Sequence, residues 1–239
     1  MTTKKKMFLE ETMKKNSYSG NITGFSRCVG CGKCCRINAC ACVPDDFNDL
    51  SLDAIEKIID TGNFMITASY EPTTKSGGIP IEVFPYISAR EVACPENGIN
   101  ITMMHSRCSM LGSDGCKFGE DERPSQGLLL IPESNSKCKC MLDTPTDFWM
   151  DYKEKLDIII KRRTGKISQE LFEEELFPRA NSIKRKIQMA VLYNEPVSYQ
   201  EYMVADAMRS LGVFYGLFGE KIGDVMNDFI DLAPVESVK

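Results

Sequence analysis

The chain has 239 residues, of which 43% are hydrophobic and 26% are charged, a composition typical of a globular protein. Its 29 basic and 34 acidic side chains give a formal net charge of -5, which disfavours nucleic acid and anionic membrane surfaces as partners. No apolar run approaches the roughly 20 residues of a membrane span, and acidic residues follow the first lysines before any run of signal-peptide length. We therefore expect a cytoplasmic protein with neither a membrane nor a nucleic-acid partner.

Cysteine is distributed unevenly along the chain. All eleven cysteines lie between Cys28 and Cys140, and the segment after Cys140 has none. In a reducing compartment, clustered cysteines are more often metal ligands or redox groups than disulfides. We predict an α+β protein with three parts. These are an N-terminal extension over 1–27, an irregular cysteine-rich metal-binding module with short strands over 28–141, and a helical region over 142–239 packed on that module.

The first motif is a run of four cysteines within residues 28–35, with Gly30 and Gly32 between them: Cys28, Cys31, Cys34 and Cys35. Two intervening residues allow a tight turn to point two sulfurs at one ion, and the glycines let backbone N–H groups approach the sulfurs. Three cysteines at this spacing also hold three corners of a [4Fe–4S] cluster. Adjacent side chains in an extended segment point apart. One of Cys34 and Cys35 is therefore a structural thiol, or the pair reaches two metals.

The segment between the two main cysteine groups predicts short elements. Ser51 is suited to cap a helix over 52–60 that ends at Thr61-Gly62. Strands are predicted over 79–87, 99–103 and 128–131, because β-branched, apolar and aromatic residues gather there.

The second cysteine group is Cys108 and Cys116, separated by a seven-residue loop. The pair Asp114-Gly115 predicts a turn in this loop, which would bring the two sulfurs back together. We expect both cysteines to contribute ligands beside the first run.

The rest of the chain has a helical pattern. Apolar spacing and capping residues predict helices over 148–159, 183–191, 198–215 and 222–232, and Pro178 should break any helix that begins near Ser168. The aromatic residues Phe148, Trp149 and Tyr152 are expected to pack this region against the cysteine module.

Residues 28–35 resemble the signature of the YkgJ-like cysteine-cluster proteins, a family described as having a zinc- or iron-chelating domain. The family pattern continues with a cysteine, a short loop, Gly-Cys and then Arg-Pro. Cys108, Gly115-Cys116 and Arg123-Pro124 match it in order, so that the resemblance covers about residues 25 to 140.

One position departs from the family pattern. The cysteine that the family has three residues after the proline is Gly127 here. We expect Cys138 or Cys140 to replace that ligand in space. The pairs Cys40-Ala41-Cys42 and Cys138-Lys139-Cys140 each place two sulfurs on the same face of an extended strand, an arrangement that suits one metal.

The expected metal ligands are all thiolates, because His105 is the single histidine and an ordinary surface role suits it better than ligation. Zinc and a [4Fe–4S] cluster both accept four thiolates, so the spacing leaves both cofactors open. The predicted ligands are Cys28, Cys31, Cys34, Cys35, Cys108, Cys116, Cys138 and Cys140.

These motifs predict a metal-binding protein whose ion or cluster is structural or carries electrons, with a protein partner docked on the helical region. Two alternatives stay open, and so does the question of whether the chain is an enzyme. The flagellin lysine N-methylases contain a similar cysteine cluster, so the resemblance implies a SAM-dependent protein-lysine N-methyltransferase as one alternative. The other is a thiol redox sensor that uses the vicinal pair Cys34 and Cys35.

Overall fold

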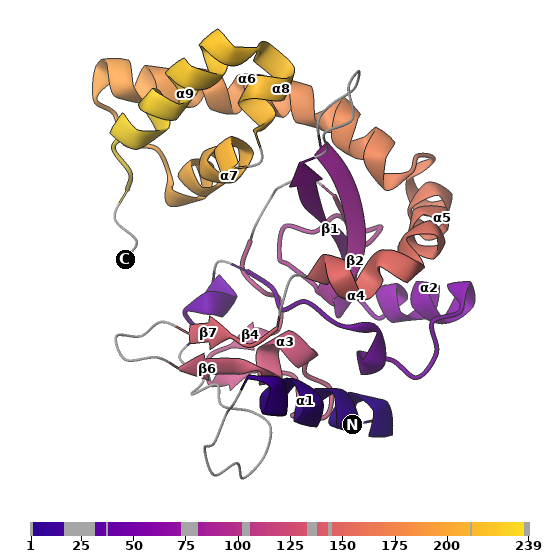
Figure 1. Cartoon of the computed structure of the whole chain (residues 1–239). Coiled ribbons are helices and arrows are strands. Elements are labelled where there is room, and N and C mark those ends of the chain that lie inside the picture. The colour runs from indigo at the N-terminus through magenta and orange to yellow at the C-terminus, as the bar shows by residue number, and fades with distance from the viewer. Residues whose placement is uncertain are drawn as a thin grey trace. The chain divides into compact units, whose positions relative to one another are not determined.

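The structure is a computed structural model that describes residues 2–16, 32–36, 38–72, 81–101, 106–132, 138–142, 145–210 and 212–236. It combines helices with one three-stranded sheet and two short strand pairs, so the predicted α+β class is confirmed (Figure 1). The chain divides into two compact units. Unit 1 comprises Met1–Ser69, Pro85–Asn100 and His105–Gly165, and unit 2 comprises Tyr70–Phe84, Ile101–Met104 and Lys166–Lys239.

This division differs from the three parts expected from the sequence. Unit 1 contains the N-terminal helix as well as both cysteine groups, and it continues to Gly165 rather than ending near residue 142. The described helices and strands of unit 1, apart from the shared sheet, are α1 (Thr3–Lys15), η1 (Cys34–Arg36), η2 (Pro44–Asp46), α2 (Leu52–Asp60), β4 (Leu111–Gly112), β5 (Gly115–Cys116), α3 (Ser125–Leu128), β6 (Leu130–Pro132), β7 (Cys138–Cys140), α4 (Pro145–Trp149), η3 (Met150–Tyr152) and α5 (Lys153–Thr164).

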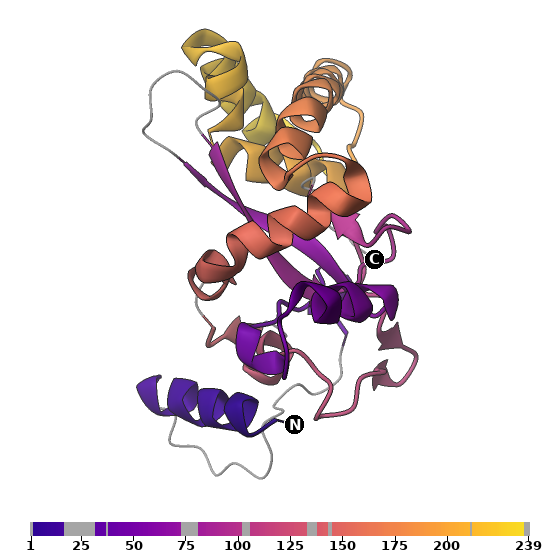
Figure 2. The same cartoon turned by 90° about the vertical axis from the view of Figure 1, so that its right-hand side faces the viewer.

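The main sheet has the strand order β2-β1-β3, formed by β1 (Phe64–Pro72), β2 (Ile81–Ala89) and β3 (Ile99–Asn100). Strands β1 and β3 run parallel, with Ile66 opposite Ile99. The two long strands, seen side by side in Figure 2, contribute residues to both units. The sequence predicted β2 two residues early and the start of β3 correctly, but it did not predict β1.

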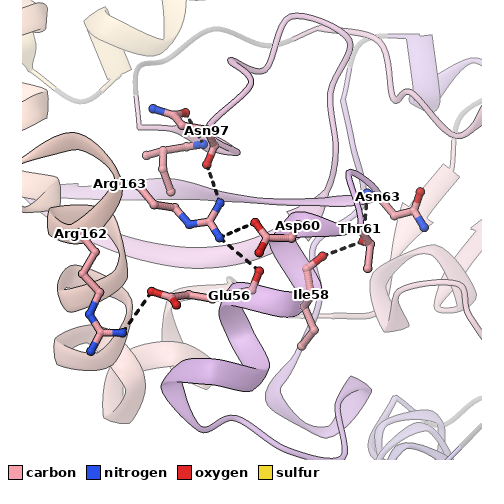
Figure 3. Close-up of polar contacts among 9 residues, drawn as sticks. Glu56, Ile58, Asp60, Thr61, Asn63, Asn97, Arg162 and Arg163 are labelled. Carbon is pink, nitrogen blue, oxygen red and sulfur yellow. Dashed lines mark hydrogen bonds and ion pairs between the residues drawn. The ribbon is translucent and has the colours of Figure 1, made fainter.

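Helix α2 forms as its capping residues predict. The hydroxyl of Ser51 accepts a hydrogen bond from the Ala54 N–H, and Gly62 follows the helix with a φ of 71°. Figure 3 shows how α5 is fixed to the end of this helix: the Arg163 guanidinium donates to Asp60 and to the Glu56 carbonyl oxygen. Cations near a helix C-terminus also interact favourably with its dipole, so this contact stabilises the packing of α5 on α2.

Helix α1 is anchored by a buried ion pair. Lys5 and Asp46 are only 2% and 4% exposed, and Lys5 Nζ lies 3.0 Å from the Asp46 carboxylate. The same ammonium group donates to the Arg123 carbonyl oxygen at 2.5 Å, and the Asp46 carboxylate accepts from the Ser125 hydroxyl at 2.7 Å. Leu9 and Met13 extend the contact into an apolar cluster. The N-terminal helix is thus an integral part of unit 1.

The helices of unit 2 are α6 (Ser168–Tyr193), α7 (Tyr199–Ser210), α8 (Val213–Phe218) and α9 (Glu220–Leu232). They pack on one another, as the orange and yellow ribbons of Figure 1 show. The capping box at α7 forms as predicted, with the Ser198 hydroxyl accepting from the Glu201 N–H. The expected continuation of this helix to residue 215 is wrong, because Gly212 adopts a φ of 67° and α8 begins after it.

The predicted break at Pro178 is also wrong, because α6 continues through this residue. A proline inside a helix lacks the N–H that would bond to the carbonyl group four residues earlier. Pro178 is exposed, so the carbonyl group of Glu174 can bond to water instead. Leu176 and Ala180, on either side of Pro178, are buried, and their packing offsets the remaining cost.

Within the residues that the structure describes, no helix is both long enough and apolar enough to cross a lipid bilayer.

Candidate metal centre

Four cysteine side chains of unit 1, Cys35, Cys40, Cys108 and Cys116, line one small cavity of about 30 Å³. They come from two stretches that are distant in the sequence, 35–40 and 108–116. The remaining lining residues are apolar apart from one cation: Ala89, Met110, Leu111, Phe118, Arg123, Pro124, Gly127 and Leu130. The positive charge of Arg123 would partly balance a negatively charged metal centre in this cavity.

The first cysteine run is described from Gly32 onward, so Cys28 and Cys31 lie outside the described residues. The expectation that Cys34 and Cys35 point apart assumed an extended backbone. They lie instead in the 3-10 helix η1, which begins two residues after Gly32 with its φ of 68°, and their sulfurs are 4.0 Å apart. The tight turn therefore brings two adjacent sulfurs to one side of the backbone.

Backbone hydrogen bonds hold the second cysteine group against the first. The Cys108 N–H donates to the Cys35 carbonyl oxygen at 2.8 Å. Strands β4 and β5 form a hairpin in which Leu111 is opposite Cys116, and Gly115 has a φ of 111°. The predicted loop between Cys108 and Cys116 is confirmed, and both cysteines lie at the same cavity.

Cys40 occupies the space beside the position at which the family pattern has a cysteine. A Cβ atom built on Gly127 would lie 3.0 Å from Cys40 Sγ. The neighbouring backbone is fixed to α3, because the Ala41 N–H donates to Gln126 Oε1 at 2.7 Å. Local spacing in the sequence gave no sign of this contact, since the two residues are far apart in the chain.

Cys138 and Cys140, the cysteines expected to replace the missing ligand, lie on strand β7. Cys140 is opposite the cavity-lining residue Leu130 in the β6–β7 pair, but it does not line the cavity itself. Its sulfur accepts from the Leu142 N–H at 3.4 Å. The side chains of Cys138 and of His105 lie outside the described residues.

Cys42 and Cys94 are buried away from the cavity. Cys42 is fully buried, and its carbonyl oxygen accepts from Trp149 Nε1 at 2.8 Å. This contact confirms that the aromatic segment after residue 145 packs onto the cysteine module. The Cys94 thiol donates to the Pro95 carbonyl oxygen at 3.5 Å. These two thiols act as small apolar side chains in the core of unit 1.

The protonation of the cluster follows from its hydrogen bonds and its burial. The hydrogen bond between the Cys34 and Cys35 sulfurs lowers the pKa of Cys34 to about 6, while the same bond and burial raise the pKa of Cys35. Burial, followed by neighbouring thiols, raises the pKa of Cys40, and burial raises that of Cys108. Binding of a metal cation would release protons from these sulfurs, because thiolates and not thiols are the ligands.

The described side chains do not by themselves form a ready-made ion site. Among them, no three cysteine, histidine or acidic side chains converge as ligands of a single ion. The four sulfurs instead surround a space.

Comparisons with protein-family models, with curated proteins and with solved structures give no match. The resemblance to the YkgJ-like cysteine-cluster family therefore stays a prediction from the motifs. A function for this chain must be inferred from the geometry of the cysteine cavity.

Proposed function

We propose that unit 1 binds a metal centre in the cysteine cavity, with Cys35, Cys40, Cys108 and Cys116 as ligands. The observation that supports this function is that four thiols from two distant stretches line a single small cavity. Cys42 and Cys94, which are buried elsewhere in the same unit, show how cysteines pack when they serve only as apolar side chains. The metal would link short segments that have little regular structure of their own.

The volume of the cavity favours a single zinc ion, whereas the arrangement of four cysteines around a space favours an iron–sulfur cluster. One water needs about 10–15 Å³, so a cavity of about 30 Å³ has room for a single ion such as zinc rather than for a four-iron cluster. A tetrahedral zinc site with bonds of about 2.3 Å sets its sulfurs about 3.8 Å apart. The ligands of a [4Fe–4S] cluster bind four separate irons and surround a space, as the cavity sulfurs do. Zinc requires the sulfurs to move inward, and a cluster requires the cavity to widen.

Metal analysis and a visible spectrum of the anaerobically purified full chain test this function. A colourless protein with one zinc per chain supports the single-ion form. Broad visible absorbance that bleaches with dithionite, together with iron and sulfide, supports the cluster. A chain that purifies without metal and takes up neither zinc nor an iron–sulfur cluster on reconstitution would overturn the proposal.

A second candidate function, a thiol redox sensor, is favoured by the 4.0 Å separation of the Cys34 and Cys35 sulfurs. Oxidation by hydrogen peroxide would form one S–S bond and break the two S–H bonds, and the two thiol protons and two electrons would reduce the peroxide to two waters. Mass spectrometry of the peroxide-treated chain would show a loss of two hydrogens within one peptide. The methyltransferase alternative stays a prediction from the resemblance.

A further inference from the structure

A second hollow of unit 1 lies next to the cysteine cavity. It has a volume of about 430 Å³ and is lined by Arg36, Arg107, Leu111, Gly112 and Ser113. Leu111 also lines the cysteine cavity, so the two spaces share this residue in their walls. Small-molecule sites in proteins commonly measure about 300–1,000 Å³, and this hollow falls within that range.

The two arginines reach this hollow from adjacent points of the backbone. Arg36 follows Cys35 and Arg107 precedes Cys108, and these two cysteines are joined by the 2.8 Å hydrogen bond from the Cys108 N–H to the Cys35 carbonyl oxygen. Both arginine side chains are exposed. The hollow therefore gathers two positive charges on a chain whose formal net charge is -5.

No carboxylate balances these two charges within the part of the chain that the structure describes. Neither Arg36 nor Arg107 has an ion pair there, and none of the five lining residues is acidic. Other arginines are paired: Arg162 with Glu56, Arg163 with Asp60, and Arg209 with Asp206 and Asp231. Two guanidinium groups that line one hollow without an acidic partner repel one another, and an anion from solution would reduce that repulsion.

We propose that this hollow binds the oxyanion group, a carboxylate or a phosphate, of a small-molecule ligand. Arg36 and Arg107 would hold the anion, since a planar guanidinium matches both groups with two parallel hydrogen bonds. The Ser113 hydroxyl is available as a further donor, and Leu111 offers an apolar contact for the rest of the ligand. The site stands on the two arginines and does not depend on the metal centre.

A second basic hollow, on α6 of unit 2, provides a matched control. It has a volume of about 500 Å³ and its lining includes Arg185 and Lys186. Here one of the two cations is already neutralised, because Lys186 pairs with Glu201. Arg185 is exposed, like Arg36 and Arg107, so its replacement also removes one exposed positive charge from a hollow of similar volume.

The test is calorimetric titration of the full chain with inorganic phosphate and, separately, with succinate. We expect saturable binding of at least one anion at one site, and the stronger of the two tells whether phosphate or carboxylate is preferred. Arg36→Gln and Arg107→Gln should each weaken it about tenfold or more. Arg185→Gln should leave it unchanged, and Arg36→Lys should fall between wild type and Arg36→Gln.

Metal content and the circular dichroism spectrum are measured on each variant, and both should match wild type because the replaced side chains are exposed. If Arg107→Gln alters the metal content or the circular dichroism spectrum, anion binding by Arg36→Gln alone decides the test. The absence of saturable binding to wild type, or an equal loss in Arg185→Gln and Arg36→Gln, would overturn the proposal. Binding that is lost in Arg36→Gln while metal content is unchanged would separate this site from the metal centre.

Discussion

The two units of this chain are stabilised in different ways. In unit 2, helices α6 to α9 bury apolar side chains such as Phe172, Ile187 and Ile230 against one another, and its sequence contains no cysteine. Apart from Ala89 at the end of β2, the helices and strands of unit 1 that line the cavity are a 3-10 turn, a four-residue helix and strands of two or three residues. Packing of long amphipathic helices can maintain unit 2, whereas short segments need specific cross-links.

Among the described ion pairs, the most deeply buried one belongs to unit 1. In unit 1, Lys5 and Asp46 are almost fully buried and joined to Arg123 and Ser125, which lie beside or at the cavity wall. In unit 2, Lys186 and Glu201 are 53% and 30% exposed. Exposed pairs contribute about 0–1 kcal/mol, but a buried charge that loses its partner is strongly destabilising. Loss of the Lys5–Asp46 pair should therefore cost more stability than loss of the Lys186–Glu201 pair.

The largest expected effect is the response of unit 1 to metal removal. Treatment of the full chain with a strong chelator under reducing conditions should raise amide hydrogen exchange in β4, β5 and α3, which contribute to the cavity wall. Helices α6 and α9 should keep their protection from exchange, because none of their described residues lines the cysteine cavity. Mass spectrometry of the exchanged peptides makes the measurement. Equal loss of protection in both units would contradict the claim that the metal stabilises unit 1 and not unit 2.

The next largest effect concerns the buried ion pair. Asp46→Asn leaves the Lys5 ammonium buried without a counter-charge, and we expect the free energy of unfolding of unit 1 to fall by about 3–5 kcal/mol. The exposed-pair control Glu201→Gln should cost about 1 kcal/mol or less. Urea unfolding followed by Trp149 fluorescence reports on unit 1, because this tryptophan lies in it. Similar losses in the two variants would mean that burial is not what distinguishes these pairs.

The smallest effect is expected in unit 2. Pro178→Ala restores a helical N–H donor in α6 and should raise the stability of this unit by about 1–3 kcal/mol. The control Met189→Ala, at another exposed position of the helix, should stay within about 0.5 kcal/mol of wild type. Thermal unfolding followed by helical circular dichroism measures both. A destabilised Pro178→Ala variant would show that the proline shapes the helix in a way that packing requires.

Local signals in the sequence predicted the elements whose caps and turns lie within a few residues. Ser51, the Ser198–Glu201 capping box and the Asp114-Gly115 turn all formed as expected. Strand β1 was missed, although Ile66 to Glu71 alternate between apolar and polar residues, a pattern typical of a half-buried strand. The passage of α6 through Pro178 depends on tertiary packing, which no local pattern reveals.

The sequence predicted only part of the candidate site, because local patterns do not reveal tertiary contacts. The expected ligands Cys35, Cys108 and Cys116 line the cavity. The spacing of the cysteines could not tell which of the other thiols lie at the cavity and which pack elsewhere in the core. Cys40 lies beside Gly127 because β2 and α3 hold its segment: the Ala89 N–H donates to the Cys40 carbonyl oxygen, and Gln126 bonds to Ala41. Such a contact depends on the whole fold.

Metal content of variants that exchange Cys40 and Gly127 tests the proposed centre most directly. Cys40→Ala should lose bound metal, whereas the control Cys42→Ala, two residues away and outside the cavity, should keep it. Cys40→Ala/Gly127→Cys should recover metal, since a Cβ at 127 is only 3.0 Å from the vacated sulfur position and the nearby Arg123 side chain can shift. Full metal content in Cys40→Ala, with all other cysteines intact, would contradict the account.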